Sequence, residues 1–346
     1  MVKGFRFLVL VVTAVTFGSS AMSTSAAETF FDGKTITIIC PFSPGGTYDR
    51  MSRLTAQFMP KHIPGAPTII VQNRTGGGGM IGARAAYRAK PNGLTILHMP
   101  STYAFRGFLG EVKDIDFTKW GWLGSVGGAH YILFIRSKLP YRSIEDLRSA
   151  SNPIKIGLLG RGSSITVTAK MLKLLGGLNF KLVRGYKGYA DIALAIRQGE
   201  VDGVSTAAVT IGVNSLTKSM VEEGFVTMIV SLGGARAAGK FASIIGKLPK
   251  FRDYIGDEIG RQTFDAYMGT FNVTRPFMTT PGIPPERLAV LRDALWKMMH
   301  DPKFIGAAEK QGFVLYPVGH EEVGKIVKAM FELPKPVGEK LREIFK

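Results

Sequence analysis

Two glycine-rich stretches of the 346-residue chain carry residue types that could hold an anion. The first runs from Pro41 to Asp49 and follows a short apolar run. Gly45 and Gly46 let the backbone approach a ligand closely, and a helix starting here would offer unpaired N–H groups that suit a carboxylate or phosphate. Thr47 adds a hydroxyl donor, whereas Asp49 is expected to cap the helix or order the loop. An ordinary turn is the alternative interpretation.

The second stretch runs from Gly157 to Thr166 and has a similar composition. A strand-like run again ends in glycines, and Ser163, Ser164 and Thr166 lead into a helical pattern. Serine at this place also serves as a helix N-cap, which is compatible with binding because only one donor need be committed to the cap. Two such loops, far apart in the sequence, predict a cleft with one lip on each of two domains.

The sequence lacks the residue patterns that disulfides, metal sites and serine hydrolases need. The single cysteine, Cys40, lies inside a strand-like run, so the chain offers no internal disulfide and no cysteine-based metal site. The segment His320–Gly324 starts like a zinc-protease motif, but Gly324 stands where the second histidine is required, and no GxSxG motif occurs. We therefore expect no metal, no cofactor and no enzymatic activity.

A third glycine cluster resembles a dinucleotide-binding loop. Gly77, Gly79 and Gly82 spell GxGxxG after an expected strand. Dinucleotide binding also needs an acidic residue about 20 positions further on, but the next strand ends at Leu97-His98-Met99-Pro100. We interpret these glycines as a turn that allows tight packing of a helix.

The chain is strongly basic, with 44 Lys and Arg against 26 Asp and Glu and a formal net charge of +18. The basic residues are scattered, without a basic run or an RNA-binding or zinc-finger signature, so nucleic acid is not an expected partner. A solvated basic surface is the simplest interpretation. A general attraction for anionic ligands or for an anionic membrane face is the alternative.

The first 27 residues have the organisation of a secretory signal peptide. Lys3 and Arg6 precede an apolar run from Phe7 to Val15, and Ser25-Ala26-Ala27 fits a signal-peptidase site. The apolar run is shorter than the ~20 residues that a membrane-spanning helix needs. We expect cleavage near Ala27 and a monomeric protein in the periplasm.

The elements that must position the two loops follow from the apolar periodicity. A mature chain of about 320 residues is long enough for two domains, and β-rich runs alternate with helical patterns, which is typical of α/β layers around mostly parallel sheets. Strands are expected at Thr35–Cys40, Thr68–Val71, Thr95–His98, Ile132–Ile135, Lys155–Leu158 and Val226–Val230. Helices are expected around Met51–Phe58, Val167–Leu174 and Leu288–Met298.

Six short motifs, in order, resemble those of the Bug-type periplasmic substrate-binding receptors of tripartite tricarboxylate transporters. They are Pro41-Phe42 through Asp49, Asn73-Arg74 through Gly79, Pro91 through Thr95, Tyr186-Lys187-Gly188, Gly199 through Asp202, and Pro281-Gly282-Ile283-Pro284. The resemblance extends through nearly the whole mature sequence.

The resemblance implies a type II periplasmic-binding-protein fold, in which two α/β domains surround a ligand cleft. Because the expected contacts lie on separate lips, we expect ligand binding to close the two domains. Domain 1 would comprise residues 28–132 and 230–346, and domain 2 residues 133–229. Such receptors hold a ligand carboxylate largely through backbone amides and waters. Carried over to this sequence, the ligand-binding residues are Phe42, Gly45, Gly46, Thr47 and Asp49 on one lip, Gly162, Ser163, Ser164 and Thr166 on the other, Ser101 and Thr102 in a third loop, and Tyr186 and Gly188 in the Tyr-Lys-Gly turn.

The sequence departs from the family pattern near the expected site. Thr166 stands where many relatives carry histidine, Lys170 where they often carry glutamate, and Asn272–Thr280 fits poorly. Arg161, inside the second loop, could add a charged contact to a second carboxylate, or it could be an ordinary surface arginine. Four aromatic residues could favour an aromatic acid, namely Tyr48, Tyr103, Phe105 and Tyr189.

Together these observations predict an extracytoplasmic solute-binding protein that captures a small organic carboxylate (a dicarboxylate, a tricarboxylate or an aromatic acid). The resemblance implies that it delivers this solute to the permease subunits of a tripartite tricarboxylate-type transporter. A periplasmic protein that feeds a sensor kinase would have the same cleft and is the alternative.

Overall fold

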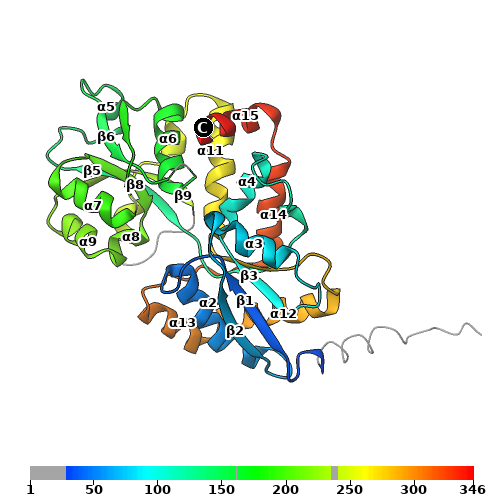
Figure 1. Ribbon diagram of the computed structural model, residues 1–346. Helices are drawn as coiled ribbons and strands as arrows, with labels where there is room; N and C mark the ends of the chain where they lie inside the picture. Colours follow the sequence, from blue (N-terminus) through cyan, green and yellow to red (C-terminus); the bar gives the residue numbers. More distant parts are fainter. Residues whose placement is uncertain (1–28, 161, 187, 235–240) are drawn as a thin grey trace, which may run out of the picture.

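The chain forms two lobes, each built on one β-sheet (Figure 1). The computed structural model describes residues 29–160, 162–186, 188–234 and 241–346, so the expected signal peptide and Arg161 lie outside the described residues. Within these ranges, no helix is long and apolar enough to cross a membrane.

The first sheet has six strands: β1 (Thr35–Cys40), β2 (Thr68–Asn73), β3 (Thr95–His98), β4 (Gly121–Ser125), β10 (Pro276–Thr279) and β11 (Val318–Gly319). Their order across the sheet is β11-β4-β10-β3-β1-β2. β1 is parallel to β2 and β3, whereas β10 is antiparallel to β3 and β4, and β11 is antiparallel to β4.

The second sheet has five strands: β5 (His130–Arg136), β6 (Ile154–Gly157), β7 (Phe180–Val183), β8 (Gly203–Ala207) and β9 (Val226–Gly234). Their order is β7-β6-β8-β5-β9. β6 is parallel to β7 and β8, whereas β5 is antiparallel to β8 and β9.

The expectation of mostly parallel sheets is wrong, because both sheets are mixed. In each sheet the strand that enters from the other lobe is antiparallel to its neighbours: β10 lies between β3 and β4, and β5 lies between β8 and β9. All six predicted strands are present, but β4, β7, β8, β10 and β11 were missed. β4 contains two glycines and β10 begins with a proline, and both residue types are uncommon in strands.

The chain passes from the first sheet to the second between β4 and β5, and it returns between β9 and β10 (Figure 1). β5 and β9 pair with each other inside the second sheet. The boundaries expected at residues 132/133 and 229/230 fall within these two strands. The division of the chain into two domains at these residues stays a prediction.

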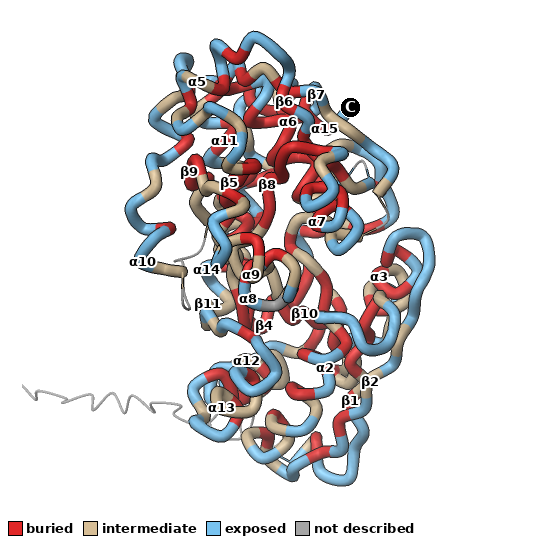
Figure 2. The backbone as a smooth tube through the Cα atoms, turned by 90° about the vertical axis from the view of Figure 1, so that its left-hand side faces the viewer, coloured by how far each residue is buried: buried red, intermediate tan, exposed pale blue. Residues whose placement is uncertain are grey.

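Helices cover both faces of the first sheet, since its strands bury apolar side chains in two separate cores. Figure 2 colours the inner strands β4 and β10 as buried. Ile36 and Ile38 of β1 pack in one core with Met51 and Leu54, whereas Ile39 belongs to the other core. The helices of this lobe are α2 (Thr47–Phe58), α3 (Met80–Tyr87), α4 (Ala104–Phe108), α11 (Glu258–Gly269), α12 (Pro285–Met299), α13 (Pro302–Lys310), α14 (His320–Phe331) and α15 (Lys335–Phe345).

The helices of the second lobe surround its sheet in the same way. They are α5 (Ile144–Arg148), α6 (Ser164–Gly176), α7 (Tyr189–Gln198), α8 (Val209–Val213) and α9 (Ser215–Glu222), and the short α10 (Ala242–Ile245) follows β9. The predicted helices correspond to α2, α6 and α12.

The C-terminal helix α15 joins the two lobes. It packs against α11 and α6, and Figure 1 shows it beside α11. The buried Lys170 of α6 donates a hydrogen bond from Nζ to the Ile344 carbonyl at 3.0 Å. The two lobes therefore share one core of buried residues in addition to the chain crossings.

The GxGxxG segment forms a turn followed by α3, as the sequence indicated. At Gly82 in α3, a Cβ atom would lie 2.8 Å from the Arg74 carbonyl and 2.9 Å from Pro41 Cβ. Glycine at this position therefore lets α3 pack directly on the first glycine-rich loop.

Candidate functional site

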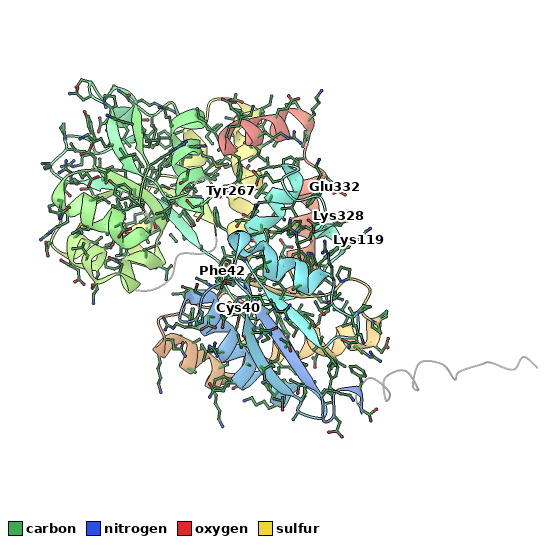
Figure 3. All side chains as sticks on the ribbon, in the orientation of Figure 1. Cys40, Phe42, Lys119, Tyr267, Lys328 and Glu332 are labelled. Carbon is green, nitrogen blue, oxygen red and sulfur yellow. The ribbon has the colours of Figure 1, made fainter. Side chains whose placement is uncertain are left out.

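A cavity of about 910 Å³ lies between the two lobes. Figure 3 places Phe42, one of its lining residues, where the lobes meet at the end of β1. The first lobe contributes Phe42, Tyr48, Gly78, Pro100, Thr102, Tyr103, Arg106, Glu111, Phe271, Thr274, Arg275 and Phe345, and the second contributes Tyr131, Gly160, Gly162, Ser163, Ser164, Ala207 and Val209, with Ala129 in the crossing between them. Five of the sequence-predicted ligand residues, Phe42, Thr102, Gly162, Ser163 and Ser164, are therefore brought together at one cavity.

The start of α6 lies at the cavity wall. Ser163 is the N-cap, and its Oγ accepts a hydrogen bond from the Thr166 amide at 3.2 Å. The same hydroxyl donates to Thr166 Oγ1 at 3.0 Å, and Ser164 Oγ accepts a hydrogen bond from the Tyr131 hydroxyl at 2.5 Å. Capping and lining thus coincide at Ser163. The amides of Ser164 and Ile165 in the first turn have no acceptor within the helix, so this wall carries a partial positive charge.

Thr166 itself is fully buried and does not line the cavity. Its Oγ1 donates to the Leu159 carbonyl at 3.0 Å, which ties the loop to the first turn of α6. Thr166 therefore stabilises the second lip without contacting the cavity.

The first lip is ordered by Asp49. The Asp49 carboxylate accepts hydrogen bonds from the Gly45 amide (2.8 Å), Asn73 Nδ2 (2.8 Å) and Arg53 Nε (3.0 Å). Burial acts to raise the pKa of Asp49, but these hydrogen bonds and the Arg53 charge hold it below its ordinary value. Asp49 therefore has the loop-ordering role that the sequence indicated. Like Gly45, Gly46 and Thr47, Asp49 is not among the residues that line the cavity.

The remaining predicted residues occupy different places. Ser101 is buried, and its hydroxyl donates to the Thr270 carbonyl at 3.1 Å. Tyr186 donates to Glu200 Oε1 at 2.8 Å on the exposed surface, and the Gly188 amide donates to Asp191 Oδ2 at 3.0 Å as the N-cap of α7. None of these three residues lines the cavity.

Aromatic side chains form much of the cavity wall. The Phe42 ring centroid lies 5.0 Å from that of Tyr48 and 6.2 Å from that of Tyr103, and the Tyr131 and Phe271 rings are in contact with their centroids 4.4 Å apart. Of the aromatic residues suspected from sequence, Tyr48 and Tyr103 line the cavity, whereas Phe105 is a core residue and Tyr189 bonds to Thr217. The lining residues Tyr131, Phe271 and Phe345 were missed, because in the sequence they look like ordinary core aromatics.

Among the described residues, three charged side chains line the cavity, and sequence reasoning named none of these three. Arg106 and Glu111 form an ion pair with an Nε–Oε2 distance of 3.3 Å, so their charges offset each other. Arg275 belongs to the stretch that fitted the family pattern poorly, and that misfit was the only signal for it. Among the ion pairs of the described residues, none includes Arg275.

His98 lies behind the first lip and is neutral. The Ser52 hydroxyl donates its one proton to the Tyr48 carbonyl at 2.8 Å. At its 2.9 Å contact with His98 Nδ1 the same hydroxyl must therefore accept, so the ring proton of His98 lies on Nδ1. The ring is fully buried and stacks on Phe277 at 4.0 Å. Burial, and secondarily the charge of Arg275, lowers the pKa of His98 to about 3.

This low pKa predicts a loss of stability in mild acid. The pKa of a histidine in the unfolded chain is near 6.5, whereas the pKa of His98 in the folded protein is about 3. Between these two pH values the unfolded state binds a proton at this residue and the folded state does not, which favours unfolding. The free energy of unfolding should fall by about 2 kcal/mol between pH 7 and pH 5 from this residue. Urea denaturation of wild type and His98→Asn at both pH values gives the change in unfolding free energy of each protein. The contribution of His98 is the difference between these two changes. Equal changes would contradict this prediction.

The described residues offer neither a metal site nor a reactive cysteine. They contain no group of three His, Cys, Asp or Glu side chains that could hold a metal. Cys40 is buried, and burial raises the pKa of its thiol, which makes it a poor nucleophile. What the site can do is bind: it combines a helix start, an arginine and an aromatic wall.

The sequence matches the model of the tripartite tricarboxylate transporter family receptor, TctC, over residues 51–341. Among curated proteins, BugT of Bordetella pertussis is 25% identical over 199 residues, which cover 56% of this chain and 60% of BugT. The chain thus spans less than two thirds of the length of the Bordetella relatives that it matches.

Solved structures show the same fold. A TctC solute-binding protein from Polaromonas, solved without ligand, has a TM-score of 0.69 at 19% identity, covering 90% of this chain and 97% of that one. MatC from Rhodopseudomonas palustris, solved with bound malate, has a TM-score of 0.58 at 17% identity, covering 90% and 99%. At these identities the likeness establishes the fold alone, and it confirms the predicted periplasmic-binding-protein-like arrangement of two α/β lobes.

Proposed function

Because this chain belongs to the TctC family of tripartite tricarboxylate transporter receptors, we propose that it captures a small organic carboxylate in the cavity between its lobes. The solute would be a dicarboxylate, a tricarboxylate or an aromatic acid, and its destination the permease subunits of a tripartite transporter. The family consists of periplasmic binding receptors and not of enzymes.

The observation that carries the proposal is the start of α6 at the cavity wall. Gly160, Gly162, Ser163 and Ser164 line the cavity, and the first turn of the 13-residue helix presents its free amides there. A helix N-terminus favours an anion through both hydrogen bonding and the helix dipole. The malate-bound relative supports a carboxylate as that anion.

The aromatic wall supports a solute with an apolar body. Phe42, Tyr48, Tyr131 and Phe271 all line the cavity, so a short alkyl chain or a ring between carboxylates would be desolvated there. In such a pocket a few polar contacts fix the orientation of the ligand, and the burial of apolar surface contributes much of the affinity.

We further propose that the two lobes close on the solute, and that the mature protein is an exported monomer that begins near Glu28. A solute that contacts residues of both lobes favours the closed state by its differential affinity for that state. The proposal for export depends on the sequence pattern of residues 1–27.

Calorimetric titration of the mature protein with malate, citrate, adipate and benzoate tests the proposed function. We expect at least one of these acids to bind with a Kd in the micromolar range or below, and its neutral amide to bind much more weakly. At saturation, small-angle scattering should report a smaller radius of gyration. Failure of all four acids to bind would contradict the proposal. An unchanged radius of gyration at proven saturation would contradict only the proposed closure of the lobes, and not the binding of the acid.

Delivery to a transporter is tested separately. Vesicles that contain the two permease subunits should take up the identified acid only when the loaded receptor is added. Specific stimulation of a sensor kinase in place of uptake would instead favour the alternative role.

A further inference from the structure

Arg275 holds a fixed place at the cavity. It directly precedes β10, which lies in the middle of the first sheet. The Arg275 amide donates to Ser125 Oγ, and its carbonyl accepts from the Val126 amide, both at 3.3 Å. The neighbouring Thr274 amide donates to the Gly127 carbonyl at 2.9 Å. Because the backbone is tied to β4 and to the crossing after it, Arg275 enters the cavity from a rigid element.

The side chain of the half-buried Arg275 donates no hydrogen bond to the described residues. Its Nε is buried and has no hydrogen-bond partner. Arg136 offers a comparison, because its Nε is also unpartnered but its NH2 donates to Asp202 at 2.6 Å. For Arg275 the described residues provide only a ring contact, with Phe313 at 6.0 Å from the guanidinium carbon to the ring centroid. Burying arginine donors without an acceptor is costly unless a ligand supplies one.

The groups around Arg275 do not neutralise its charge. The Tyr48 hydroxyl donates to the Thr274 carbonyl at 2.7 Å, the Tyr131 hydroxyl donates to Ser164, and His98 is neutral. Burial raises the pKa values of Tyr48 and Tyr131, so neither becomes a counter-anion near neutral pH. Since Arg106 and Glu111 offset each other, Arg275 is the uncompensated cation of the described cavity lining.

We propose that Arg275 binds a carboxylate group of the captured solute and so determines the selectivity for acids over neutral analogues. This inference rests on the proposed function and adds a side-chain cation, placed in the first lobe, to the amides of α6 in the second. The planar guanidinium fork matches the two oxygens of a carboxylate, which gives a stronger and more directional contact than an amide alone.

The chain offers a matched control for this residue. Arg50 also lies over the Phe313 ring, at 5.4 Å, and removing it changes the net charge equally. Arg50 is held by Gln311, whose carbonyl accepts from NH2 at 2.7 Å, and it does not line the cavity. A variant at Arg50 therefore reproduces the lost ring contact and the lost charge without touching the proposed carboxylate contact.

The test compares wild type, Arg275→Gln, Arg275→Lys and Arg50→Gln in calorimetric titrations. The probe is whichever of malate, citrate, adipate or benzoate binds wild type most tightly, together with its neutral amide. We expect Arg275→Gln to weaken acid binding by about 10- to 150-fold, as for the loss of a hydrogen bond to a charged group, and to leave amide binding unchanged. Arg50→Gln should change acid binding less than about twofold. Arg275→Lys should retain part of the affinity, because it keeps the charge and loses the fork.

The outcomes separate the two proposals. If wild type binds an acid and Arg275→Gln binds it equally well, the role of Arg275 is wrong and the proposed function stands. If Arg275→Gln weakens the acid and the amide alike, Arg275 is a structural residue. If wild type binds none of the acids, the proposed function fails and this inference fails with it. Should Arg275→Gln misfold, as judged by its melting temperature, the acid-to-amide ratio of Arg275→Lys decides.

Discussion

Replacing Gly162 by valine should lower the affinity for the carboxylate by at least about 100-fold and leave the fold intact. Gly162 lines the cavity immediately before the N-cap of α6, and a Cβ atom there would meet nothing within 4 Å. The valine side chain therefore fits without a clash, but it occupies the space through which an anion reaches the α6 amides. By comparison, Ser163→Ala removes one neutral hydrogen bond and should cost only about 2- to 12-fold.

Gly256→Val is the matched control for this change. Gly256 also precedes the N-cap of a long helix, Asp257 of α11, and a Cβ atom there also meets nothing within 4 Å. Gly256 is exposed and lies outside the cavity lining. Calorimetric titration with the identified acid should show wild-type affinity for Gly256→Val, and melting curves should be similar for both variants. Near wild-type binding by Gly162→Val would show that the α6 loop is not the anion site.

Replacing Asp202 by alanine should destabilise the protein by about 3–5 kcal/mol. The Asp202 carboxylate accepts a hydrogen bond from Arg136 at 2.6 Å and another from the Lys155 amide at 2.9 Å. Only 10% and 13% of the Arg136 and Asp202 side chains are exposed. The pair joins the ends of β5 and β6 to the loop before β8, and its loss leaves a buried guanidinium without a counter-charge. Urea denaturation measures the change.

Two further variants show whether the buried charge causes this loss. Asp293→Ala breaks an ion pair with Lys297 in which both side chains are more than half exposed, and it should cost less than about 1 kcal/mol. The double variant Arg136→Met/Asp202→Leu removes both buried charges, so it should recover a large part of the stability that Asp202→Ala loses. A double variant as unstable as Asp202→Ala would assign the effect to the Lys155 contact and not to the charge.

For the site, sequence reasoning found the loops but not the whole wall. Gly162, Ser163 and Ser164 could be found because glycines followed by hydroxyl residues at a strand-to-helix junction form a local signal. Gly45, Gly46 and Thr47 carry the same signal yet do not line the cavity, because Asp49 and Asn73 fold that loop so that Phe42 and Tyr48 lie there instead.

The sequence by itself determined the fold class, the family, and most of the strands and helices that carry the loops. The family and its two-lobed fold were indicated by the resemblance of six short motifs. The strands and helices depend on periodicity, capping and turn chemistry, which act between residues close in the chain. Only the tertiary structure decided which strands run antiparallel. The strands β5 and β10 each pair with partners that are distant in sequence, and nothing local encodes their direction.

The tertiary structure also decided which charges are free. Glu111 lies close to Arg106 in the chain and pairs with it, whereas the fold places no counter-charge for Arg275 among the described residues. Tyr48, Tyr131 and His98 come from three separate segments, and each is already committed to another partner or held neutral by burial. Whether a buried charge is compensated depends on every element packed against it. No local pattern in a single sequence shows the combined effect of groups that come from distant parts of the chain.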